Sequence, residues 1–199
     1  ILPKYRGPNP EFWHYMNMEK EQGITIHYID EGEDTGDILY QQIVSVPLGM
    51  KSPERLDLLI TNTAVPALFD VIDGIQNSTI VPHVQPVESP TPRARNIKES
   101  EHSKCIDWNI WSVEKIWNIL RGTELWLNAL PAPTGFYTGS RWIIDDFVKM
   151  PVNGGYEYGK IYQDKKHHFV ACKDGIVYIH RKFKLINLIK RHILIILLK

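Results

Sequence analysis

Cysteine is scarce in this sequence, which has only Cys105 and Cys172 among its 199 residues. The two lie far apart and form no Cys-x-x-Cys pair, so the sequence predicts neither a disulfide framework nor a zinc site. We therefore predict no bound metal ion. Such sparing use of cysteine is typical of proteins from a reducing cytoplasm, and we expect that location.

A surplus of charge is also missing, because 23 Lys and Arg residues balance 23 Asp and Glu residues. A protein built chiefly to hold nucleic acid usually carries a basic surplus, so we expect no nucleic-acid partner. The balance is uneven along the chain. Residues 181–199 carry six bases and no acid, which leaves residues 1–180 with 17 bases and 23 acids.

Long hydrophobic runs are absent as well. The longest uncharged apolar run in the tail is residues 193–198, far short of the ~20 residues that span a bilayer, so we predict no transmembrane segment. Pro3, Lys4 and Arg6 interrupt any apolar start, and no signal peptide is expected. We interpret the tail, residues 183–199, as a packed or dimerising helix, since an unburied apolar stripe invites association into a homodimer. A basic helix on a membrane surface and a sequence altered near the gene's end are the alternatives.

Local signals predict three helices. Asn9 followed by Pro10 has the pattern of an N-cap and first turn. The following segment, residues 11–19, has Phe12, Trp13, Tyr15 and Met16 at helical spacing. Ser52 starts a second helix by the same logic, and Pro66 should kink that helix or end its first part. A third helix is predicted over residues 112–122, with a serine cap and a terminal glycine.

Residues 30–37 form the most unusual stretch, with five acids in eight residues. Apolar strand patterns precede it and follow it, at residues 23–29 and 38–46. Gly32 and Gly36 let the loop fold back, because glycine takes positive φ at little steric cost. Acids gathered at the mouth of a strand pair repel one another, which raises a pKa toward the range useful for proton transfer. The alternative is a solvated acidic hairpin.

The same stretch carries a family resemblance. Residues 23–38, Gly-Ile-Thr-Ile-His-Tyr-Ile-Asp-Glu-Gly-Glu-Asp-Thr-Gly-Asp-Ile, resemble the second active-site segment of the folate-dependent formyltransferases. Residues 1–7, Ile-Leu-Pro-Lys-Tyr-Arg-Gly, resemble the family's Leu-Leu-Pro-x-x-Arg-Gly segment, in the family's order and with its spacing. Weaker similarity continues to about Lys182. Within the family, the chain is most similar to the nucleotide-sugar N-formyltransferases.

The resemblance implies an α/β fold followed by a small antiparallel β domain. Residues 1–92 would be the C-terminal part of a Rossmann-like catalytic domain with its linker, and residues 93–182 an OB-like open barrel. Prolines at positions 82, 86, 90 and 92 suit an extended, poorly packed linker over about 76–104. The family's Asn-x-His pair, which precedes the Leu-Leu-Pro segment in relatives, does not occur in this sequence. We therefore expect the later part of a longer protein or a shortened gene product.

The resemblance also assigns site residues. The family's catalytic Asp corresponds to Asp34. The backbone that receives the pterin ring of 10-formyltetrahydrofolate corresponds to the cofactor-binding residues Ile29, Asp30, Glu31 and Gly32.

Four further polar side chains lie within or near these motifs in the sequence. Arg6 and Asn9 would line the same cleft as substrate-binding residues, with a surface cation and a helix cap as the alternative roles. His14 and His27 match neither motif, so we assign neither a catalytic role, and we interpret His27 as a structural histidine with satisfied hydrogen bonds.

The implied function is transfer of a formyl group from 10-formyltetrahydrofolate to the amine of a nucleotide-linked amino sugar, for surface-polysaccharide biosynthesis. The Arg-Gly-Pro-Asn-Pro segment and the acid-rich residues 1–180 favour a nucleotide-sugar substrate over tRNA. Methionyl-tRNA formyltransferase is the first alternative. The second is a catalytically incompetent fragment that acts as a binding or oligomerising module, which the missing Asn-x-His pair favours. A hydrolase of formyltetrahydrofolate is a weaker third.

Overall fold

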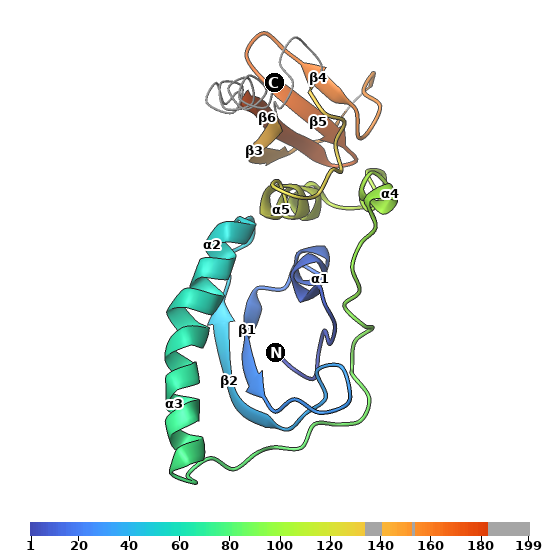
Figure 1. The fold of residues 1–199 in the computed structure, drawn as a ribbon. Coiled ribbons are helices and arrows are strands. Elements are labelled where there is room, and N and C mark those ends of the chain that lie inside the picture. The colour runs from blue at the N-terminus through green and yellow to red at the C-terminus, as the bar shows by residue number, and fades with distance from the viewer. Residues whose placement is uncertain (134–140, 153, 183–199) are drawn as a thin grey trace, which may run out of the picture. The chain divides into compact units, whose positions relative to one another are not determined.

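The computed structural model describes residues 1–133, 141–152 and 154–182. These residues form two compact units, which divide between Ile97 and Lys98 (Figure 1). The division falls inside the predicted linker. The tail, residues 183–199, lies outside the described residues.

The first unit packs a helix and a two-stranded antiparallel sheet against one long helix (Figure 1). Asn9 caps the first helix, because its side-chain oxygen accepts the backbone N–H of Phe12 at 3.2 Å, and Phe12 and Tyr15 are buried beneath it. In chain order, the elements are α1 (Pro10–Met16), β1 (Glu21–His27), β2 (Ile38–Ser45), α2 (Ser52–Leu56), η1 (Asp57–Ala64) and α3 (Val65–Gln76).

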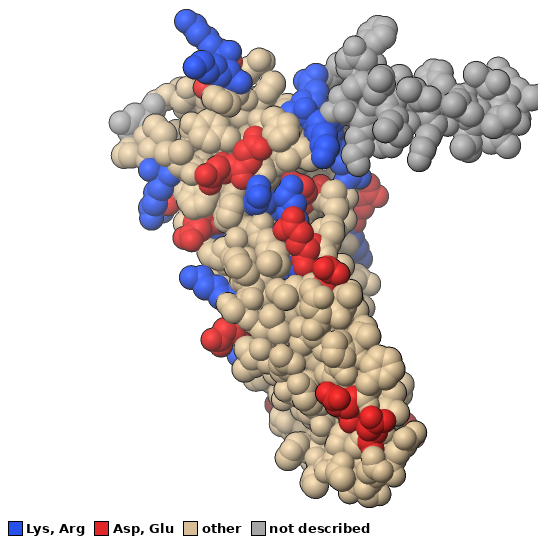
Figure 2. Space-filling view, turned by 90° about the vertical axis from the view of Figure 1, so that its left-hand side faces the viewer, with Lys and Arg blue, Asp and Glu red and all other residues tan. Residues whose placement is uncertain are grey.

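The long helix runs without a break from Ser52 to Gln76. Pro66 lies in the first turn of α3, directly after the π-helical segment η1, so the helix changes its hydrogen-bond pattern there instead of ending. Its length and composition alone would allow it to cross a membrane, and only 22% of its apolar window is buried, but a single helix of this kind is weak evidence. Here it packs on β1 and β2. Leu68 and Phe69 of this helix are exposed. Charged side chains are sparse on the lower part of the face shown in Figure 2.

The segment after α3 is extended, as predicted, but it is not poorly packed. His83 exchanges backbone hydrogen bonds with Ile38, at 2.8 Å in both directions. Ala94, fully buried, donates to the carbonyl of Arg6 at 2.8 Å and accepts from the N–H of Asn9 at 2.9 Å. The predicted linker therefore returns along the first unit and holds its opening segment in place.

The second unit is a helix on an open antiparallel sheet. The predicted helix over 112–122 is confirmed, since the Ser112 hydroxyl accepts the N–H of Lys115 at 3.3 Å. Its buried side chains, Ile116 among them, pack on the sheet with Val170 and Val177, all fully buried. In chain order, the elements are α4 (Glu99–His102), α5 (Val113–Gly122), β3 (Arg141–Lys149), β4 (Ile161–Gln163), β5 (His168–Cys172) and β6 (Gly175–Lys182).

The strand order in this sheet is β3-β6-β5-β4. In the described part of the chain, β3 and β4 are both edge strands, so the sheet does not close into a barrel. The mixed α/β fold is confirmed, and the OB-like barrel is not.

Candidate functional site

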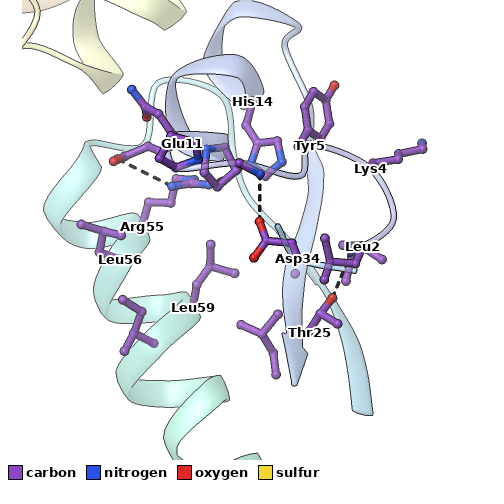
Figure 3. A pocket seen from close by; sticks show the side chains of 18 of the residues that line it. Leu2, Lys4, Tyr5, Glu11, His14, Thr25, Asp34, Arg55, Leu56 and Leu59 are labelled. Carbon is purple, nitrogen blue, oxygen red and sulfur yellow. Dashed lines mark hydrogen bonds and ion pairs between the residues drawn. The ribbon is translucent and has the colours of Figure 1, made fainter. Parts of the chain in front are cut away.

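A cavity of about 480 Å³ opens in the first unit between the chain's opening segment, α1, β1 and the long helix (Figure 3). Its volume falls in the range of about 300–1,000 Å³ that is typical of small-molecule pockets. Apolar side chains of the long helix, Leu56, Leu59 and Ile60, form part of the wall. The remaining wall carries polar groups, among them Asn9, Glu11, His14, Thr25, His27, Asp34 and Arg55.

Asp34 lies in this wall, and its position is fixed by a contact with the chain's opening segment. The backbone N–H of Gly7 donates to the Asp34 Oδ2 atom at 2.8 Å. The backbone of Asp34 has φ of 56°, in the left-handed region that non-glycine residues seldom adopt. Gly36 is required two residues later, since a Cβ there would lie 1.9 Å from the carbonyl oxygen of Tyr28. The loop therefore turns sharply around Asp34 and presents its carboxylate to the cavity.

His27 is the neighbour of Asp34 that sequence reasoning set aside. Its Nε2 atom lies 3.8 Å from Asp34 Oδ1, and its Nδ1 atom lies 2.7 Å from the carbonyl oxygen of Tyr28. Because a carbonyl oxygen can only accept a hydrogen bond, Nδ1 carries the proton of the neutral ring. Nε2 is then the unprotonated nitrogen, and it is the one that faces Asp34. The available signal was topological: His27 ends β1, and the tight acidic loop brings the chain back to the same place.

The opposite wall is built around the buried guanidinium of Arg55. Arg55 Nη2 donates to His14 Nδ1 at 2.8 Å, its Nη1 lies 3.6 Å from Glu11 Oε1, and its Nε donates to the side chain of Gln22. Burial, and then the charge of Arg55, lower the pKa of His14 to about 3. His14 is therefore neutral at ordinary pH, and its Nδ1 atom accepts a hydrogen bond from Arg55.

Arg6 was expected either to line the cleft or to be a surface cation, and the structure places it in neither position. The residue is only 7% exposed and is not part of the cavity wall. Its guanidinium donates to the carbonyl oxygens of Val87 and Pro86, at 2.9 and 2.8 Å, and to Gln85 Oε1 at 2.9 Å. Arg6 is thus neither a surface cation nor a side chain facing the cleft, because it ties the opening segment to the chain after α3.

Asn9 combines the two roles that the sequence left open. It caps α1 through its side-chain oxygen, and it also lines the cavity. Whether its amide contacts a substrate stays a prediction.

The loop predicted to receive the pterin ring lies at the surface. Ile29 is 96% exposed, and Ile29, Asp30, Glu31 and Gly32 are not part of the cavity wall. Their role in cofactor binding stays a prediction.

The expected rise in carboxyl pKa does not occur at the two loop acids that show a shift. A hydrogen bond from the Thr35 hydroxyl, at 2.6 Å, is the main cause that lowers the pKa of Asp30. The Arg93 guanidinium lowers the pKa of Glu33 in the same way. Local donors outweigh the repulsion between neighbouring acids at these positions.

No group of three or more His, Cys, Asp or Glu side chains suited to a metal ion occurs among residues 1–133, 141–152 and 154–182.

Sequence comparison relates this chain to formyltransferases. Residues 1–72 match the family model described as formyl transferase. The chain is 32% identical over 182 residues to methionyl-tRNA formyltransferase of Clostridium beijerinckii, covering 91% of this chain and 56% of that protein. It is 32% identical over 180 residues to the Thermodesulfovibrio yellowstonii enzyme, covering 90% and 54%. The chain thus spans about half the length of these curated relatives.

Solved structures share the fold. HypX from Aquifex aeolicus in complex with tetrahydrofolic acid matches with a TM-score of 0.56 and 16% identity, over 88% of this chain and 30% of that one. An N-formyltransferase from Helicobacter canadensis, bound to folinic acid and dTDP-3-aminofucose, matches with a TM-score of 0.54 and 21% identity, over 92% and 63%. The resemblance to the formyltransferases expected from the sequence is confirmed.

Proposed function

We propose that this chain, a relative of the formyltransferases, carries part of an active site that transfers a formyl group from 10-formyltetrahydrofolate to an amine. One observation supports this most directly. Inside the matched segment, residues 1–72, Asp34 faces a cavity of ligand size, with its carboxylate held by Gly7 and flanked by His27.

The reaction needs a group that accepts a proton. An amine that attacks the formyl carbon gives a tetrahedral centre with an oxyanion and an ammonium, and the ammonium must lose a proton before the carbon–nitrogen bond to the folate breaks. The Asp34 carboxylate is the acceptor in our proposal. Its Oδ2 is occupied by Gly7, so Oδ1 takes the proton and returns it to the departing folate nitrogen as the carbon–nitrogen bond breaks, with Nε2 of His27 lying 3.8 Å from Oδ1.

The oxyanion needs hydrogen-bond donors that the motifs of this sequence do not supply. Relatives use an Asn-x-His pair, and the sequence contains none. The activity of the whole protein is therefore part of the proposal, with the binding or oligomerising module as the alternative.

We propose a nucleotide-linked amino sugar as the amine substrate. The acid surplus of residues 1–180 supports it, because binding of tRNA relies on contacts between basic side chains and phosphates. Methionyl-tRNA is the second candidate, and the curated relatives favour it, since the similarity to methionyl-tRNA formyltransferases at 32% identity extends over both units.

The test is a formylation assay on the purified chain with 10-formyltetrahydrofolate and either dTDP-3-aminofucose or methionyl-tRNA. Turnover of the sugar supports the proposal, and turnover of methionyl-tRNA alone overturns the substrate assignment. Absence of turnover with both would refute transferase activity for this chain.

Asp34→Asn tests the proposed acceptor, because asparagine still accepts the Gly7 N–H but cannot take the proton. We expect kcat to fall about 10²–10⁴-fold. Asp37→Asn in the same loop is the matched control and should leave kcat within about a factor of three, because Asp37 is half-buried but is not part of the cavity wall. Equal rates for the native chain and Asp34→Asn would remove Asp34 from the mechanism.

A further inference from the structure

Gln85 lies in the segment after α3, outside every motif of the sequence, and is only 7% exposed. Its side-chain amide uses both its donor and its acceptor group. The Nε2 atom donates to the carbonyl oxygens of Asp34, at 3.1 Å, and of Gly36, at 2.6 Å. The Oε1 atom accepts from Arg6 Nη2 at 2.9 Å.

We infer that Gln85 is the positioning residue of Asp34: its buried amide fixes the turn from which the carboxylate reaches the cavity. As far as catalysis is concerned, the inference rests on the proposed function. Its structural content, that Gln85 determines where the Asp34 carboxylate lies, can be tested without any assay of transfer.

The backbone of this turn needs such a support. A left-handed conformation costs a non-glycine residue free energy and persists only where the surrounding structure enforces it, and Asp34 has φ of 56°. The two carbonyls that Gln85 binds flank Thr35, so one side chain holds both ends of the strained turn. Without the amide, both carbonyls would lose their partner at a partly or fully buried position, which favours a rearranged loop.

A closed ring of contacts explains why the position of Asp34 depends on the opening segment. The Arg6 side chain binds Gln85, and Gln85 binds the backbone of Asp34. The next residue, Gly7, donates its N–H to the carboxylate of the same Asp34. Adjacent residues of the Arg-Gly motif thus hold Asp34 at two points. Gly7 binds the carboxylate directly, whereas Arg6 acts through the side chain of Gln85.

The experiment follows the Gly7 amide proton by NMR in the full chain, because this proton lies on the Asp34 carboxylate. Its chemical shift should report this hydrogen bond, and its exchange with solvent should be slow. Gln85→Leu removes the three hydrogen bonds of the amide. We expect the chemical shift of the Gly7 amide proton to change and its exchange to speed up at least about tenfold. In Gln85→Glu, the carboxylate still accepts from Arg6 but donates nothing to the loop, so the same changes should appear.

Gln22→Leu is the matched control. Gln22 is buried at 2% exposure, its Oε1 accepts from the guanidinium of Arg55, and its Nε2 donates to the carbonyl of Glu19 at 3.2 Å. Its loss should destabilise the same unit without altering the Gly7 signal. This control separates a positioning role from general stabilisation.

Formylation kinetics supply the second readout. We expect Gln85→Leu to lower kcat at least about tenfold, with a smaller change in KM, because only the placement of the proton acceptor is altered. An inactive native chain would refute the proposed function and leave the Gly7 measurement as the test of Gln85.

A Gly7 amide proton in folded Gln85→Leu with the native chemical shift and exchange rate would overturn the inference. If that variant does not fold, hydrogen exchange in the native chain is the test. The side-chain amide protons of Gln85 should then exchange slowly with solvent, and rapid exchange would also overturn the inference.

Discussion

Lowering the pH from 7 to 5 should destabilise the first unit through one side chain, His14. The ring is 6% exposed and accepts a hydrogen bond from Arg55 at Nδ1, so a proton can be added there only at the cost of that bond and next to a buried positive charge. Burial, followed by Arg55, lowers the pKa of His14 from 6.5 to about 3 in the folded chain.

The sign and size follow from the two pKa values. Between pH 6.5 and about 3, the unfolded chain binds a proton at His14 that the folded chain does not. The stability contributed by the neutral ring is therefore complete above pH 6.5 and is lost as the pH falls through this window. At about 1.36 kcal/mol per pH unit, the loss between pH 7 and pH 5 is about 2 kcal/mol.

Urea titrations at pH 7 and pH 5 would measure this loss. Trp13 is the only tryptophan among residues 1–97, and its indole N–H donates to the carbonyl of Arg95 at 3.0 Å, so its NMR signal reports on the first unit. His14→Asn is the control, because the asparagine oxygen can still accept from Arg55 but does not titrate. We expect the native chain to lose about 2 kcal/mol more than this variant. Equal losses in the two proteins would refute the buried, neutral His14.

Two further results are expected. Gly7→Ala should lower the free energy of unfolding by about 1–3 kcal/mol in a urea titration, because φ at this position is 128° and the new Cβ would lie 2.9 Å from the carbonyl oxygen of Ala94; an unchanged midpoint would contradict it. Both cysteines should react slowly with iodoacetamide at pH 8, since burial raises the pKa of Cys105 to about 11 and also raises that of Cys172. Mass spectrometry would show the labelling, and reaction in the native chain as fast as in urea would contradict the assignment.

Features that depend on near neighbours were predicted well. The caps of α1 and α5 join Asn9 to Phe12 and Ser112 to Lys115, each across three residues, so the sequence pattern contains the whole interaction. The strand–loop–strand unit over residues 23–46 is confirmed for the same reason, since alternation and loop glycines are local signals. A family motif was enough to identify Asp34 as the candidate.

The sequence by itself therefore determined the local elements, the α/β class and the family resemblance of this chain. Only the tertiary structure decided how Asp34 is held, because its partners are distant in the sequence. Gly7 is 27 positions from Asp34, and Gln85 is 51 positions from it. Arg6, which binds Gln85, is 79 positions from that residue. It also placed His27 beside Asp34. Propensities and spacing act over a few residues, whereas these contacts exist only once the segment after α3 has returned along the first unit.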